Sequence, residues 1–188
     1  MYMADMHQDR YAQWPVRGRS VKGFTLVELL VTIVIGVLLM VVAVPSFMTF
    51  QRNAQLSDAV SNFIAATNAA RANAMKQGVD AYLVPKSGTD WKTGWTVYAD
   101  TNWNQSYDAG TDPIILSFDA LASSVSIGTT TSSLTSGYVR FNGSGYPRLK
   151  NNGFGGGTIV MSNGTRSSSI IIDPAGRVRS CTTGTTGC

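Results

Sequence analysis

An apolar run of about 21 residues, at positions 24–44, constrains this chain more than any other feature of its sequence. At a rise of about 1.5 Å per residue, a helix of that length crosses the hydrocarbon core of a bilayer. Lysine and arginine precede the run, which predicts a cytoplasmic N-terminal side and places the rest of the chain across the membrane. Glu28 is the only charge inside the run, and a carboxylate in a membrane segment is costly enough to need an explanation.

The helical pattern continues beyond the apolar run. Apolar residues recur every three or four positions and polar residues occupy the other face, as in an amphipathic helix. Gly78 then follows, and glycine is the residue that most often ends a helix. We therefore expect one long helix over residues 24–78, of which residues 24–44 are transmembrane. The apolar stripe comprises Leu56, Val60, Phe63, Ile64, Ala70, Ala74 and Met75.

From Val79 onward, short β-favouring runs alternate with clusters of Gly, Asn, Ser and Asp. This pattern is typical of a small antiparallel sheet or sandwich. We predict an α+β fold in which the long N-terminal helix packs on a β-rich domain at residues 79–188. The expected strands lie at residues 81–84, 94–99, 113–118, 124–127, 138–141, 158–162, 168–173 and 177–180.

The heptapeptide K-G-F-T-L-V-E, which leads into the apolar run, resembles the prepilin signature of type IV pilins and type II secretion pseudopilins. In that family a membrane peptidase cuts after the glycine and methylates the new N-terminal residue. The resemblance implies that residues 1–23 are a leader, that the cut falls between Gly23 and Phe24, and that Phe24 becomes N-methylated. Glu28 is then the fifth residue of the mature chain.

Later segments are similar to the FimT/GspH group of minor pilins and pseudopilins, so the resemblance covers nearly the whole chain after Lys22. It implies a filament subunit with a pilin-like fold, without enzymatic activity or a cofactor. It also implies other pilin subunits, the prepilin peptidase and the inner membrane as partners. The similar segments are AARANAMKQGVDAYLV (69–84), WKTGWTVYAD (91–100), FNGSGYP (141–147) and SSSIIIDPAGRVRS (167–180).

Filament assembly would explain Glu28. Cleavage after Gly23 creates an ammonium group on every subunit, and a neighbour's ammonium beside the Glu28 carboxylate neutralises both charges away from water. Such pairing favours the correct register between helices in a filament core. The alternative is a plain membrane anchor with an incidental glutamate, which leaves the charge without a partner.

The C-terminal part of the chain is basic, because residues 140–188 hold six Lys and Arg side chains against a single Asp. The stretch G-R-V-R (176–179) places Arg177 and Arg179 on one face of a strand, where two guanidiniums can clamp backbone phosphates. In the FimT group this turn is linked to DNA capture in natural transformation. The resemblance implies sequence-independent, salt-sensitive binding of double-stranded DNA; the alternative is a solvated basic edge strand. Further candidates for the DNA-binding surface are Arg148, Lys150 and Arg166.

Cys181 and Cys188 are the only cysteines and fit one disulfide in an oxidising compartment. The only histidine, His7, falls in the expected leader, so the mature chain lacks the residue most used in metal sites and acid–base catalysis. The oxygen-rich loop at residues 100–112 resembles a calcium loop only in composition, because the EF-hand glycine and glutamate positions are occupied by Gln and Thr. We expect no metal and no cofactor, and we expect these side chains to satisfy their own turns.

Two further stretches are interpreted as structural. N-N-G-F-G-G-G-T (151–158) lacks the Gly-Lys-Ser/Thr ending of a phosphate loop and is predicted to be a flexible loop. Trp95 and Val97 alternate as core residues do, whereas Trp103 lies in a polar loop and is the tryptophan expected at the surface.

The sequence leaves three functions open. The first is a minor type IV pilin in the inner membrane, with a periplasmic domain that later stands on the pilus and captures DNA through Arg177 and Arg179. The second is a minor pseudopilin of type II secretion, which binds other pseudopilins and exported protein. The third, an anchored periplasmic enzyme, is disfavoured because the mature chain has no histidine and no compact nucleophile–base pair.

Overall fold

The computed structural model describes residues 23–185 and 188. Residues 1–22 of the expected leader therefore lie outside the described residues. The chain divides into two compact units between Ala43 and Val44, a point inside one continuous helix, α1 (Leu26–Gln77). The helix has 52 residues and agrees with the predicted range of 24–78 to within two residues at either end.

In the first unit, the apolar side chains of α1 point outward and are exposed. By length and composition, α1 is long and apolar enough to cross a membrane. A helix that is apolar on all sides is stable only where other apolar groups surround it. Lipid tails or the helices of other subunits provide such surroundings.

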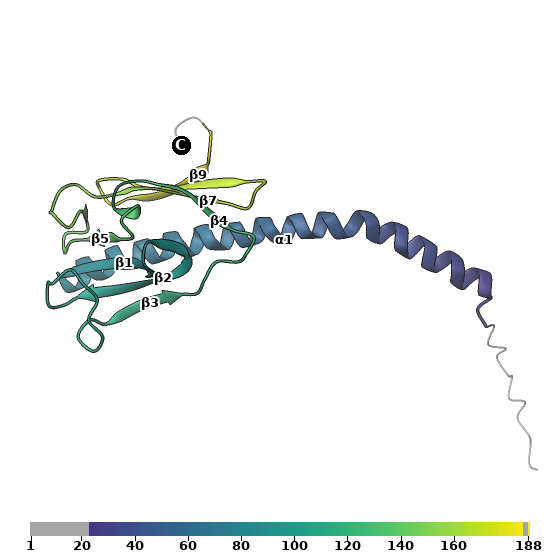
Figure 1. Ribbon diagram of the computed structural model, residues 1–188, viewed down its shortest axis with the longest axis horizontal. Coiled ribbons are helices and arrows are strands. Elements are labelled where there is room, and N and C mark those ends of the chain that lie inside the picture. Colours follow the sequence, from purple (N-terminus) through teal and green to yellow (C-terminus); the bar gives the residue numbers. More distant parts are fainter. Residues whose placement is uncertain (1–22, 186–187) are drawn as a thin grey trace, which may run out of the picture. The chain divides into compact units, whose positions relative to one another are not determined.

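In the second unit, α1 buries one face against two β-sheets (Figure 1). The Phe63 ring lies between Trp91 and Trp95, at centroid distances of 5.3 Å and 5.2 Å and in edge-to-face geometry. Small residues continue this face toward the end of the helix, which lets the sheets approach its backbone. These small residues are Ala59, Ala66, Ala70 and Ala74, all of them buried.

The end of α1 is set by Gly78, as the sequence predicts. Its φ of 69° is left-handed, and its N–H donates to the Ala74 carbonyl at 2.9 Å. The chain then enters the first strand only two residues later. Because Gly78 adopts the left-handed conformation, the chain can leave the helix and start the first strand after a connection of only two residues.

The first sheet has five strands in the order β3-β2-β1-β5-β6, and every pairing is antiparallel. Leu83 pairs with Val97 across the central hairpin, so both side chains face the core. The strands are β1 (Asp80–Ser87), β2 (Asp90–Asp100), β3 (Ile114–Phe118), β5 (Val139–Phe141) and β6 (Pro147–Arg148).

The second sheet has four antiparallel strands in the order β4-β7-β8-β9. Ile159 pairs with Ile170, and both are fully buried. A disulfide joins Cys181, in the edge strand β9, to Cys188, as expected. The strands are β4 (Ser126–Thr130), β7 (Gly157–Ser162), β8 (Ser167–Ile172) and β9 (Val178–Thr182), and a short 3-10 helix, η1 (Ser132–Leu134), follows β4.

The predicted α+β architecture is confirmed: the long helix packs on antiparallel sheets, and each of the expected runs overlaps a strand. β6 was not predicted, because a strand of two residues is too short to carry a period-two pattern. Trp95 is buried in the core, and Trp103 has 59 % of its surface exposed, as expected for both.

Candidate assembly and DNA-binding sites

Thr25 and Glu28 lie at the start of α1. The Glu28 N–H donates to Thr25 Oγ1 at 3.2 Å, so Thr25 caps the helix. The T-x-x-E spacing is that of a capping box, and a carboxylate in the first turn also meets the positive end of the helix dipole. Glu28 therefore has a local role in starting α1, besides the assembly role predicted from the sequence.

Arg71, on α1, holds the G-R-V-R turn in place. Its Nε donates to the Gly145 carbonyl at 3.0 Å, Nη1 to the Gly176 carbonyl at 2.9 Å, and Nη2 to the Ala175 carbonyl at 3.2 Å. One guanidinium thus joins two turns that are far apart in the sequence to the helix. The sequence did not point to this role; its only signal was an arginine in an alanine-rich stretch of helix.

The two turns also touch each other directly. A Cβ on Gly176, whose φ is 80°, would lie 2.5 Å from the Gly145 carbonyl oxygen. No real side chain tolerates that distance, so only glycine allows the two backbones to approach in this way. The residues next to these glycines, Tyr146 and Arg177, are consequently carried on adjoining turns.

Asp173 organises the turn from within. Its Oδ1 accepts the backbone N–H groups of Ala175 at 3.0 Å and of Arg177 at 2.9 Å, and its Oδ2 accepts Arg177 Nε at 3.1 Å. The Arg177 side chain nevertheless keeps 73 % of its surface exposed. The turn therefore presents a guanidinium to solvent on a backbone that is fixed at both ends.

Asp173 should stabilise the turn in a pH-dependent way. The N–H of Arg177 is the main reason that the pKa of Asp173 lies below its ordinary value; partial burial opposes this effect, and the Arg177 guanidinium and the Ala175 N–H add to it. A lowered carboxyl pKa gives stability that is present above about pH 4 and is lost as the pH falls through the folded-state pKa. We expect Asp173→Asn to lower the free energy of unfolding by about 0.5–1 kcal/mol at pH 7.

The measurement is urea unfolding of both proteins at a series of pH values. The difference between them should shrink on acidification, because the wild-type carboxyl then becomes neutral too. Asparagine keeps an oxygen that can accept the backbone N–H groups, so this variant removes the charge and preserves the turn's shape. A difference that is constant with pH would contradict the role given to the charge.

The other predicted DNA-binding residues are distributed unevenly around this turn. Arg179 is exposed on β9, two residues after Arg177, while Val178 between them packs against the core. Arg148 lies on β6, three residues after Gly145, whose carbonyl contacts Gly176. Arg166 lies directly before β8, and Asp173 lies directly after it. The length of the strand, roughly 20 Å at 3.3 Å per residue, therefore separates Arg166 from the turn that begins at Asp173.

Lys150 belongs to a different neighbourhood. Its Nζ donates to the Gln105 carbonyl at 3.0 Å and lies 5.7 Å from the centroid of the Tyr138 ring. These contacts tie the lysine to the oxygen-rich loop that follows β2. Of the five predicted DNA-binding residues, Arg148, Arg177 and Arg179 lie on backbone segments that adjoin one another.

The carboxylates of the oxygen-rich loop accept hydrogen bonds from the backbone and side chains of the loop itself. Asp100 accepts the N–H groups of Asn104 and Gln105, and Asp112 accepts those of Thr101 and Asp108. Burial alone would raise the pKa of Asp112, but these hydrogen bonds outweigh it and hold the pKa below its ordinary value. The expectation that these side chains satisfy their own turns is confirmed, and within residues 23–185 no cluster of His, Cys, Asp and Glu has the arrangement of a metal site.

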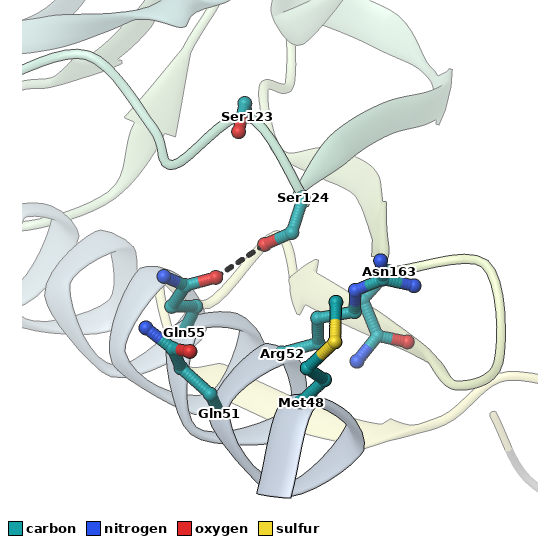
Figure 2. Close-up of a pocket in the computed structure, with 7 residues that line it drawn as sticks. All are labelled: Met48, Gln51, Arg52, Gln55, Ser123, Ser124 and Asn163. Atoms are coloured by element: carbon teal, nitrogen blue, oxygen red, sulfur yellow. Dashed lines mark hydrogen bonds between the residues drawn. The ribbon is translucent and has the colours of Figure 1, made fainter. Parts of the chain in front are cut away.

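A polar cleft of about 380 Å³ lies between α1 and the loops before β4 and after β7 (Figure 2). Ser124 Oγ donates to Gln55 Oε1 across it, and Asn163 Nδ2 donates to Asn53 Oδ1 at 2.8 Å. These bonds join the helix to both loops. The lining provides amides, hydroxyls and one guanidinium, and no carboxylate or imidazole for acid–base chemistry; it consists of Met48, Gln51, Arg52, Gln55, Ser123, Ser124 and Asn163.

Comparison with known proteins identifies the family. A family model described as type II transport protein GspH matches residues 59–176, which is more than half of the chain. The chain belongs to this family. A second model, the prokaryotic N-terminal methylation motif, matches residues 18–44. The curated protein sequences gave no significant match.

Two crystal structures of the type IV minor pilin FimU from Pseudomonas aeruginosa share the fold. The first has a TM-score of 0.51 at 18 % identity and covers 69 % of this chain and 90 % of the FimU chain. The second has a TM-score of 0.51 at 15 % identity and covers 66 % and 91 % of the two chains. The FimU structures show that the chain has a pilin fold. The GspH family and the methylation motif place it among the minor pilins and pseudopilins, a grouping that implies processing by prepilin peptidase and assembly with other pilin subunits.

Proposed function

We propose that this GspH-family protein is a minor type IV pilin that is cut between Gly23 and Phe24 and methylated on Phe24. In the filament, the Glu28 carboxylate pairs with the N-terminal ammonium of a neighbouring subunit. The exposed apolar surface of the first unit and the methylation motif support this proposal. Before assembly, residues 24–44 cross the inner membrane and the β domain lies in the periplasm.

The β domain of this subunit binds double-stranded DNA without sequence preference, through Arg177 and Arg179. The observation that carries this proposal is the Arg71 clamp, which fixes the turn before the exposed Arg177 and the start of β9, where Arg179 is also exposed. A backbone that is already fixed loses little freedom when the arginines that it carries bind phosphates. Arg148, on the adjoining turn, extends the basic surface.

The test is a titration of the full chain, purified in detergent, with a labelled duplex of mixed sequence at several salt concentrations. We expect Arg177→Ala/Arg179→Ala to weaken binding by at least about tenfold, because charge-assisted hydrogen bonds are lost. The salt dependence, taken as the slope of log K against log salt, should fall by about 1 for each phosphate contact removed.

The matched control is Arg52→Ala/Arg166→Ala, which removes the same net charge from exposed positions away from the turn. It should change the affinity far less than the turn variant. Equal losses in both variants would mean that overall charge attracts the DNA and that the turn does not. Unchanged affinity in the Arg177→Ala/Arg179→Ala variant would contradict the proposed DNA site.

The second candidate is a minor pseudopilin of a type II secretion system. The description of the matching family model favours it, since that family is named for type II transport. Deletion of the gene separates the two functions when piliation, DNA uptake and protein secretion are scored together. Loss of secretion with intact piliation would favour the pseudopilin, and loss of piliation and DNA uptake with intact secretion would favour the minor pilin.

A further inference from the structure

Two aromatic side chains stand exposed next to the G-R-V-R turn. Phe154 has 76 % of its surface exposed, more than any other large hydrophobic side chain described from Val44 onward, and Tyr146 has 47 % exposed. Between them lies the Arg148 guanidinium, with its Cζ 5.2 Å from the Phe154 centroid and 5.9 Å from the Tyr146 centroid. We call Tyr146, Arg148 and Phe154 the aromatic platform.

Backbone contacts hold the segments of the aromatic platform in place. Phe154 forms an isolated antiparallel bridge with Arg148. A Cβ on Gly155 would lie 2.6 Å from the Arg148 nitrogen, so the glycine is needed for this close approach. The stretch at 151–158, predicted to be a flexible loop, is thus packed tightly at this point and carries its phenylalanine in a defined place.

The platform adjoins the arginines of the proposed DNA site. Tyr146 follows Gly145, whose carbonyl shares the Arg71 guanidinium with Gly176. On the other side, a Cβ on Gly156 would lie 2.5 Å from the Ile172 carbonyl, directly before the turn. The Asp173–Arg177 turn therefore contacts both segments that carry the rings, and the turn and the platform adjoin each other through their backbones to make up one surface.

We propose that this surface binds single-stranded DNA, with unpaired bases stacked on Phe154 and Tyr146 and the backbone phosphates held by Arg177 and Arg179. This inference rests on the proposed DNA-binding function and extends its substrate from duplex DNA to strands with unpaired bases. Exposed aromatic rings beside a basic groove are the combination by which proteins hold single strands without sequence preference. Arg148 covers one face of Phe154, and an incoming base stacks on the open face.

A duplex cannot use the rings in the same way, because its bases are stacked on each other and face inward. The phosphates are available in both forms of DNA. The rings should therefore add affinity for single strands alone, whereas the arginines should contribute to both. This difference separates the platform from the arginine turn by experiment.

The experiment is a fluorescence anisotropy titration of the full chain in detergent against a labelled single strand of mixed sequence and against the blunt duplex of that sequence. We expect Phe154→Leu to weaken single-strand binding by at least about fivefold, the low end of what one stacked base contributes. Duplex binding should change by less than about twofold. Tyr146→Leu should act in the same direction.

Trp103→Leu is the matched control, because it removes an exposed aromatic ring from the loop after β2; it should leave both affinities unchanged. Thermal unfolding of each variant shows whether the fold is kept. If Phe154→Leu weakens neither form while Arg177→Ala/Arg179→Ala weakens both, the platform inference is wrong and the proposed duplex-binding function stands. Equal weakening of both forms by Phe154→Leu also overturns it. A wild-type chain that binds neither form overturns both proposals.

Discussion

Replacing Asp80 by alanine should lower the free energy of unfolding by about 3–5 kcal/mol, the usual loss when one partner of a buried ion pair is removed. Asp80 Oδ2 accepts Arg140 Nη2 at 2.6 Å and Nε at 2.7 Å, and both side chains are buried beside the β1–β5 pairing. Without the carboxylate, the Arg140 guanidinium keeps its charge in a site with little access to water. Urea unfolding of the full chain in detergent, followed by tryptophan fluorescence, measures the change.

The control is Asp80→Leu/Arg140→Met, which replaces the whole pair by apolar side chains. We expect this double variant to be much more stable than Asp80→Ala, because no uncompensated charge is left inside. If both variants lose the same stability, the effect comes from packing around β1 and not from the charge on Arg140.

The pair also supports the surface proposed to bind DNA. Arg140 Nη1 donates to the Leu149 carbonyl at 3.0 Å, directly after β6. β6 carries Arg148 and has only two residues, so it depends on such side-chain anchors more than on its own ladder. Disruption of the pair should loosen the aromatic platform as well as the sheet.

The sequence predicts the helix and the main strands because each is long enough to show its period. The stripe through Phe63 has the helical spacing and is buried except for Ile64, which is partly buried, and Met75, which is 48 % exposed. Alternation in β2 places Trp95 inside. The assembly motif is local too: residues 23–28 lie next to one another, so a resemblance can be read without the fold.

The surface next to the turn could not be predicted in the same way. Arg71, Gly145 and Gly176 are far apart in the sequence and meet only because α1 packs against both sheets. The exposure of Phe154 depends on the backbone of β6, a strand too short to leave a pattern. Grouping all basic residues of the C-terminal part by sequence likewise placed Arg166 with Arg177, although β8 separates them.

Replacing Arg71 by methionine should lower the free energy of unfolding by about 2–4 kcal/mol and weaken DNA binding as much as removal of Arg177 and Arg179 together. Three carbonyls lose their donor, and hydrogen bonds from a charged group each contribute about 1.5–3 kcal/mol without full additivity. The turn then lacks its tie to α1, so its arginines sample positions in which they no longer face the same phosphates.

Arg71→Lys tests whether geometry or charge is responsible. Lysine keeps the charge but offers one point-like ammonium, which cannot reach three carbonyls from one position, so it should recover only a small part of both losses. Arg52→Met is the control, because it removes an exposed arginine from the same helix and should change stability by less than about 0.5 kcal/mol. Full recovery with lysine would show that a positive charge on α1 is sufficient and that the three-way clamp does not position the turn.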